Sequence, residues 1–289
     1  GLSLGGHTTI AVMYAEGAIV DGEGDLNNVG GDKFSRELRR LRQDPSVKAI
    51  VLRVNSPGGS VSASEAIQRE VRLTQKVKPV IVSMGTYAAS GGYWISTYSD
   101  HIFAEPSTIT GSIGVFGVQF DVKKLANDFG VTFDSVSTGK FAGSLTITRP
   151  KTEEELAVLQ RMVDWVYEQF TTKVSESRHL KLDFVREIAQ GRVWSGSEAK
   201  KLGLVDEIGD LDVAIKYAAD RAKVGNDYRL EEYPRKKDFA EALAEAVEKM
   251  NPGAGAHATT LVGRVSARLT DELKALEAFN DPQGLYARL

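Results

Sequence analysis

Short apolar runs rich in β-branched residues alternate with helical patterns, and this alternation is the strongest constraint on the fold. The segments "TTIAVMYAEGAIV" (8–20), "VKAIVLRVN" (47–55) and "KPVIVSMG" (78–85) have the composition and length of buried strands. A helix is predicted over 32–44, and the Ser-x-x-Glu pattern at 62–65 is typical of another helix N-terminus. The alternation predicts an α/β layered fold with a largely parallel sheet.

The pattern changes to helices after "TITGSIGVFGVQFDV". The segment 152–178 carries three glutamates in its first turn, where the helix dipole favours acidic residues. From about Pro234 the chain is rich in Ala, Glu and Lys and is interrupted at 251–260. We therefore predict an α/β domain over 1–233 and a C-terminal helical region over 234–289. The apolar face expected for the long helix consists of Leu156, Leu159, Val163, Val166, Phe170 and Val174.

Composition excludes several classes of function. The net charge of −3 and the absence of a basic block longer than "RKK" (235–237) argue against a nucleic-acid partner. The absence of cysteine excludes disulfides and a cysteine nucleophile. No apolar run reaches the roughly 18–20 residues of a membrane-spanning helix, so the chain as given is expected to be soluble. Its abrupt start is expected of a piece of a longer protein.

Three Gly-rich segments each follow a predicted strand: "NSPGGSV", "AASGGYW" and "TGSIGVFG". In a parallel sheet such segments share an edge and can converge on one site. Acyl transfer needs a nucleophile, a base and N–H groups that face the developing oxyanion. Ser90, at a strand-to-helix turn, is the candidate nucleophile, and Gly59 and Gly91 are the candidate N–H donors. The structural alternative is that these small residues only allow a helix to pack closely on the sheet.

No cofactor or metal site is predicted. The phosphate-loop pattern GxxxxGK[ST] is absent, and "DGEGD" (21–25) lacks the full spacing of a calcium loop. The four histidines are scattered without metal-ligand spacing, and His101, at a strand start, is interpreted as structural.

Taken together, the motifs resemble the signal peptide peptidase A family, serine endopeptidases of the Clp/crotonase-like fold. The resemblance is carried by "VLRVNSPGGSVSASEAI", "MGTYAASGGYWIST", "PSTITGSIGVFG" and "WSGSEAKKLGLVDEIGD" and covers about residues 9–233. The ending "LEAFNDPQGLYARL" is similar to the C-terminus of the family's long, tandem-domain form. The resemblance therefore implies the C-terminal half of a two-domain, membrane-associated enzyme.

The resemblance also implies a role for each site residue. Ser90 matches the nucleophile, Gly59 and Gly91 match the oxyanion-hole donors, and Ser112 matches the serine that orients the base. That base is a lysine, which completes a Ser-Lys dyad. Here Ala142 takes the expected lysine position. Lys140 lies two residues earlier and would serve only after a register shift, so the resemblance implies a lysine from the homologous N-terminal domain.

Partners and location follow from the same resemblance. The implied substrates are cleaved signal peptides and other hydrophobic or unfolded peptides, and the implied assembly is a homo-oligomer, a tetramer of two-domain protomers. The implied location is the bacterial inner membrane, with the catalytic domain on the periplasmic side, or a thylakoid membrane. Two alternatives stay open: a crotonase-type acyl-CoA enzyme, and a non-catalytic half that serves as an assembly scaffold.

Overall fold

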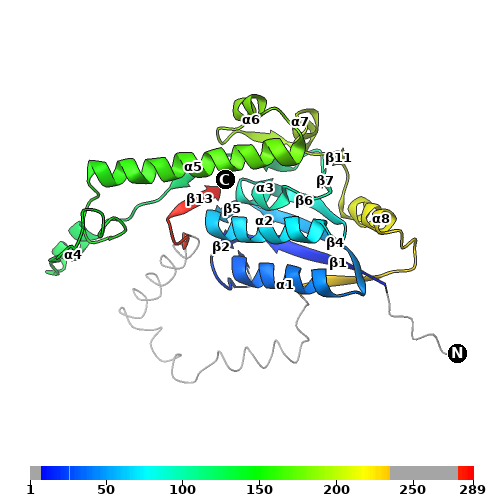
Figure 1. Cartoon of the computed structure of the whole chain (residues 1–289), viewed down its shortest axis with the longest axis horizontal. Helices are drawn as coiled ribbons and strands as arrows, with labels where there is room; N and C mark the ends of the chain where they lie inside the picture. The colour runs from blue at the N-terminus through cyan, green and yellow to red at the C-terminus, as the bar shows by residue number, and fades with distance from the viewer. Residues whose placement is uncertain (1–7, 26, 235–278) are drawn as a thin grey trace, which may run out of the picture.

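A mostly parallel sheet lies at the centre of the residues that the computed structural model describes, which are 8–25, 27–234 and 279–289 (Figure 1). All strand pairs in this sheet are parallel except the pair of β8 and β10. The prediction of a layered α/β fold with a largely parallel sheet is confirmed. The strand order is β10 (Val193–Ser195), β8 (Ile109–Gly111), β6 (Val80–Ala89), β4 (Val47–Ser56), β1 (Thr9–Glu16) and β12 (Arg229–Tyr233), with β7 (His101–Ala104) on β6 and β11 (Glu207–Ile208) on β7.

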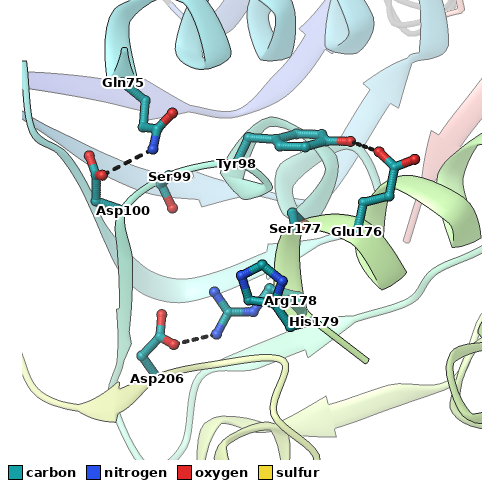
Figure 2. Close-up of a pocket in the computed structure, with 9 residues that line it drawn as sticks. All are labelled: Gln75, Tyr98, Ser99, Asp100, Glu176, Ser177, Arg178, His179 and Asp206. Atoms are coloured by element: carbon teal, nitrogen blue, oxygen red, sulfur yellow. Dashed lines mark hydrogen bonds and ion pairs between the residues drawn. The ribbon is translucent and has the colours of Figure 1, made fainter. Parts of the chain in front are cut away.

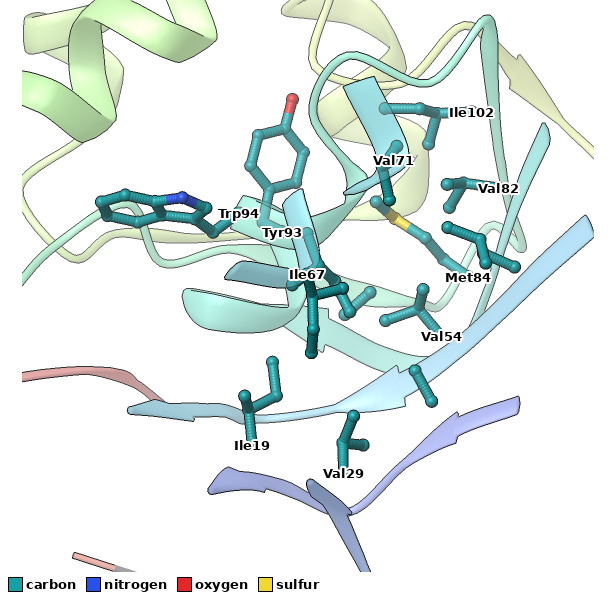
Figure 3. Packing of buried hydrophobic residues seen from close by; sticks show 14 of the residues in the cluster. Ile19, Val29, Val54, Ile67, Val71, Val82, Met84, Tyr93, Trp94 and Ile102 are labelled. Atoms are coloured by element: carbon teal, nitrogen blue, oxygen red, sulfur yellow. The ribbon is translucent and has the colours of Figure 1, made fainter. Parts of the chain in front are cut away.

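Helices cover both faces of this sheet. Along β1, Ala11 and Met13 belong to the larger apolar cluster, whereas Ile10 and Val12 belong to the smaller one beneath α8 (Leu211–Ala222). This alternation follows from the two-residue period of a strand. Figure 3 shows part of the larger cluster, where side chains from the sheet pack against residues of α2 and α3. The helices over the larger cluster are α1 (Gly31–Gln43), α2 (Val61–Gln75) and α3 (Gly91–Ser96).

A second, smaller sheet lies beside the first. It contains β3 (Asn28–Gly30), β2 (Ala18–Val20), β5 (Gly58–Ser60), β13 (Leu285–Arg288) and β9 (Phe116–Gly117), in that order. The chain's C-terminal strand, β13, runs antiparallel to both of its neighbours, β5 and β9.

This strand corrects part of the prediction for 234–289. Residues 235–278 lie outside the described part of the chain, but the last residues form a strand instead of a helix. Pro282 and Gly284 are unsuited to a helix interior, and the buried side chains of Leu285 and Tyr286 pack into the domain.

The long helix α5 (Glu153–Arg178) begins as predicted, with a capping box between Thr152 and Glu155. Most of the predicted apolar face packs against the domain, but Leu156 is 49% exposed. In Figure 1 this end of α5 extends away from the sheets, next to residues 118–150, which carry α4 (Lys123–Asp128) and are called the arm here. The remaining helices, α6 (Leu182–Ile188) and α7 (Gly196–Lys201), lie near the other end of α5 (Figure 1).

Helix α2 begins earlier than the Ser-x-x-Glu pattern predicts. Ser60 is the N-cap, and its hydroxyl accepts from the Ala63 N–H over 3.1 Å. Glu65 instead accepts from the indole N–H of Trp94 over 3.0 Å and pairs with Lys173 over 3.1 Å. Tertiary partners therefore take the glutamate away from the capping role. Within the described ranges, no helix has the length and apolar character needed to cross a membrane.

Candidate active site

Ser90 occupies a strained turn between β6 and α3. Its backbone has φ 54° and ψ −112°, a region that costs on the order of 1–3 kcal/mol for a residue with a side chain. Two backbone hydrogen bonds hold it there: the Ser90 N–H donates to the Gly111 carbonyl, and the Trp94 N–H donates to the Ser90 carbonyl, both over 2.8 Å. A serine held on a strained strand-to-helix turn is also how other hydrolase folds present a nucleophile.

The pairing of β6 with β8 places Ser112 beside this turn. Ala89 pairs with Gly111, and the Thr110 hydroxyl donates to the Ala88 carbonyl over 2.7 Å. Ser112 follows directly, with φ 47° and its N–H donating to the Arg192 carbonyl over 2.7 Å. Its side-chain hydroxyl has no hydrogen-bond partner within the described residues, so it is available to a group that enters the site.

The Ser90 hydroxyl has only a weak partner. It donates to the Gly114 carbonyl over 3.4 Å, near the outer limit of a hydrogen bond, and Ser90 is 1% exposed. Across 8–25, 27–234 and 279–289, no histidine, lysine or carboxylate accepts its proton. The described part of the chain therefore presents a buried hydroxyl without a base.

Glycine is required at both candidate donor positions. A Cβ at Gly59 would lie 1.9 Å from the Ile19 carbonyl oxygen, and a Cβ at Gly91 would lie 2.8 Å from the Ala287 carbonyl oxygen. The neighbouring Gly58 is not a candidate donor, because its N–H already donates to the Ser56 hydroxyl over 3.1 Å. Gly59 and Gly91 thus let other backbone groups approach at distances that a side chain would forbid.

The Ala287 carbonyl lies beside the glycines of this region. Ala287 is the register partner of Gly59 in the pair of β13 with β5. A Cβ at Gly58 would lie 2.1 Å from the Ala287 carbonyl oxygen and 2.5 Å from the Gly91 nitrogen. The Ala287 oxygen and the Gly91 nitrogen therefore both lie close to the Gly58 backbone. Sequence reasoning did not place Ala287 beside Gly59. The available signal was the turn-forming "NDPQG" before a short apolar run.

Three lysines that could be considered as a base are engaged away from Ser90. Lys140 lies on the arm, is largely exposed and pairs with Glu154 over 2.8 Å. Burial lowers the pKa of Lys78, but its amine donates to backbone carbonyls at the end of α1, and it precedes β6 whereas Ser90 follows it. Burial also lowers the pKa of Lys151, whose amine donates to the Thr146 carbonyl.

His101 packs as a structural residue. Its ring lies 4.7 Å from the ring centre of Phe103 and 4.4 Å from that of Tyr217, on the face covered by α8. Ser90 instead belongs to the turn that opens α3, a helix on the opposite face.

A separate hollow of about 430 Å³ lies near the C-terminal end of α5. Figure 2 shows that its polar side chains pair with one another: Gln75 with Asp100, Tyr98 with Glu176, and Arg178 with Asp206. Burial, reinforced by Glu176, raises the pKa of the Tyr98 hydroxyl. None of the candidate catalytic residues lines this hollow.

Comparisons with known proteins relate the chain to serine peptidases. The model of peptidase family S49 matches residues 72–225, and the Clp protease model matches residues 7–105. The chain is 45% identical over 285 residues to Protease 4 of Salmonella typhi, covering 96% of this chain and 46% of that protein. It is 37% identical over 225 residues to the chloroplastic serine protease SPPA of Arabidopsis thaliana, covering 76% of this chain and 33% of that protein.

A shorter relative and a solved structure complete the comparison. The chain is 35% identical over 211 residues to a putative signal peptide peptidase SppA of Enterococcus faecium, covering 71% of this chain and 61% of that protein. A ClpP1 mutant from Listeria monocytogenes superposes with a TM-score of 0.47 and 18% identity over 71% of this chain and 94% of its own. The chain spans about half the length of Protease 4.

Proposed function

The chain belongs to peptidase family S49, and on that premise we propose that it is the nucleophile-bearing half of a Ser-Lys endopeptidase. One observation carries the proposal. The strained Ser90 turn is bonded to Gly111, the residue before Ser112, and is followed by Gly91. Gly91 lies with Gly59 beside the Ala287 carbonyl of the extended strand β13.

Ser90 has the role of nucleophile. Its Oγ attacks the scissile carbonyl carbon while a neutral lysine amine takes the hydroxyl proton. The N–H groups of Gly59 and Gly91 stabilise the oxyanion of the tetrahedral intermediate. The lysine then returns the proton to the departing amine, which leaves an acyl-enzyme, and water releases the second product through the same proton transfers in reverse order.

The lysine comes from the homologous N-terminal half. Three observations support this assignment: Ala142 takes the expected lysine position, Lys140 pairs with Glu154, and the chain covers only 46% of Protease 4. The unpaired Ser112 hydroxyl accepts from the incoming amine and orients it toward Ser90. Burial at this interface lowers the pKa of the lysine enough for it to serve as a base near neutral pH.

The arm supplies contacts for assembly. It exposes several large apolar side chains, and monomeric soluble proteins rarely expose large contiguous apolar surface. We assign this surface to contacts with homologous domains in a tetramer of two-domain protomers. The most exposed apolar residues on the arm and the adjoining part of α5 are Phe129 (80%), Val136 (99%), Leu145 (63%) and Trp165 (64%).

The proposed substrates are supported by the relatives' names. Relatives named signal peptide peptidase or SPPA come from a bacterium and a chloroplast, so we propose cleaved signal peptides and other hydrophobic or unfolded peptides as substrates at a membrane. We propose that the peptide binds in an extended conformation against a strand edge.

Reconstitution tests this function. Cleavage of a fluorogenic hydrophobic peptide is measured with the 289-residue chain alone, with the N-terminal half of the natural protein, and with both. We expect cleavage only with both halves and loss of cleavage with Ser90→Ala in the mixture. Ser90-dependent cleavage by this chain alone would place the base within it. Calorimetry with coenzyme A checks the crotonase alternative, and we expect no heat of binding.

A further inference from the structure

The segment 111–114 of the candidate site is held from two sides. On one side, the Ser90 N–H donates to the Gly111 carbonyl over 2.8 Å. On the other side lies the turn 189–192, which joins α6 to β10. Because the segment carries Ser112, the proposed orienting serine, the contacts on this second side also fix the proposed site.

Two reciprocal hydrogen bonds join the turn to the segment. The Ser112 N–H donates to the Arg192 carbonyl over 2.7 Å, and the Gly191 N–H donates to the Ile113 carbonyl over 2.9 Å. The two backbones are also close, since a Cβ at Gly114 would lie 3.1 Å from the Gly191 Cα. A change in the turn is therefore transmitted directly to the backbone of Ser112.

The backbone is strained on both sides of this contact. In the site, Ser90, Gly111 and Ser112 have φ of 54°, 78° and 47°. In the turn, Gln190 and Gly191 have φ of 60° and 72°. Positive φ is unfavourable for a residue with a side chain and persists only where the surrounding contacts hold it. The conformation of the site thus depends on a support that keeps the turn in place.

Trp194 on β10 provides this support. Its indole N–H donates to the Ile188 carbonyl over 3.0 Å, at the end of α6, so the side chain reaches back across the turn and closes it. The same ring lies on Gly111, where a Cβ would come within 2.8 Å of the Trp194 Cδ1 atom. The pairing of β10 with β8 places Val193 opposite Gly111 and aligns the two contacts. One side chain therefore contacts both the start of the turn and the segment of the site.

We propose that Trp194 is a positioning residue of the peptidase site. It holds the turn 189–192 against the segment 111–114, and through them it fixes the backbones of Ser90 and Ser112. This inference rests on the proposed function and adds to it a residue from outside the three Gly-rich segments. Loss of the indole N–H loosens the turn and lets Ser112 move. The chemical step then slows, because it depends on the exact placement of the reacting groups, whereas peptide binding does not.

Kinetics of the assembled two-half enzyme test this role. Trp194→Phe keeps a ring beside Gly111 and removes the indole N–H. We expect kcat for peptide cleavage to fall at least about fivefold, with KM within about twofold of wild type. Tyr98→Phe is the matched control, because it also keeps a ring and removes one hydrogen bond, to Glu176 in the separate hollow (Figure 2). A kcat that is unchanged in Trp194→Phe, or that falls equally in Tyr98→Phe, would overturn the proposal.

Hydrogen exchange of the 289-residue chain alone tests the inference without using activity. In the wild type, the Ser112 and Gly191 amides should be similarly protected, because one opening breaks both bonds. In Trp194→Phe we expect both amides to exchange at least about fivefold faster, with the amides of β4 unchanged. Protected Ser112 beside an unprotected Gly191 in the wild type, or unchanged exchange in the variant, would overturn the proposal. Absence of Ser90-dependent cleavage by the wild-type two-half enzyme is a separate result, which contradicts the proposed function whatever the exchange shows.

Discussion

The Ser90 N–H donates to the carbonyl of Gly111 over 2.8 Å, and this bond joins the turn after β6 to the residue that precedes Ser112. Both serines have positive φ, 54° and 47°, and both are nearly buried. Two strained residues are thus held side by side by the pairing of β6 with β8, which fixes the nucleophile relative to the proposed orienting hydroxyl.

Ser112→Ala tests that relationship in the assembled two-half enzyme. We expect kcat to fall by about tenfold or more, because the lysine loses the hydroxyl that orients it, while KM changes little. Ser177→Ala serves as the matched control, because it removes a hydroxyl near the C-terminal end of α5. It should leave kcat and KM unchanged. An unchanged kcat in Ser112→Ala would remove Ser112 from the mechanism.

Gly59→Ala tests the close approach at β5. The new methyl group would lie 1.9 Å from the Ile19 carbonyl oxygen, which belongs to the rigid backbone of β2. We expect a loss of at least about 2 kcal/mol in the free energy of unfolding, measured by urea denaturation. Gly139→Ala meets no atom within 4 Å and should stay within about 0.5 kcal/mol of wild type. Similar values for the two variants would contradict the packing described.

Lys140→Ala separates the two possible sources of the base. Lys140 forms an exposed pair with Glu154, a type of interaction that contributes about 0–1 kcal/mol. We expect activity of the assembled enzyme to stay within about twofold of wild type, because the base comes from the other half. A loss of about a hundredfold or more would identify Lys140 as the base and refute the two-half dyad.

Glu155 gives the stability a dependence on acid pH. The Arg149 guanidinium, followed by the Thr152 N–H, lowers the pKa of this carboxyl from 4.5 to about 2. A lowered folded-state pKa gives stability that is complete above about pH 4.5 and is lost as the pH falls toward 2. The advantage of wild type over Glu155→Gln in urea denaturation should therefore shrink over this range. Glu153→Gln, in the same turn, is the control, and a constant difference between wild type and Glu155→Gln would contradict the assignment.

The sequence predicts the central architecture well because its signals are local. β-Branched runs predict the strands, and the three glutamates of the first turn with the apolar face predict α5. Local patterns were insufficient where tertiary contacts decide. Glu65 pairs with Trp94 and Lys173 instead of capping α2. Leu156 has the spacing of a core residue but is exposed near the start of α5.

In the candidate site, too, local motifs predict some positions and tertiary contacts determine others. Ser90, Gly59 and Gly91 lie in short motifs after strands, so their convergence follows from parallel topology. The position of Ala287 beside Gly59 depends on pairing between residues more than 200 positions apart, which no local pattern reveals. The turn residues Asp281 to Gly284 do argue against a helix there, although composition places this segment in the helical region.

Labelling by a serine-reactive phosphonate tests the central claim most directly. The two-half enzyme is treated with the probe, and the modified residue is identified by mass spectrometry. The account predicts one modified serine, Ser90, with modification much slower when the N-terminal half is omitted. Two results would contradict it. One is loss of cleavage with the probe attached to a different serine, and the other is continued peptide cleavage after Ser90 has been fully modified.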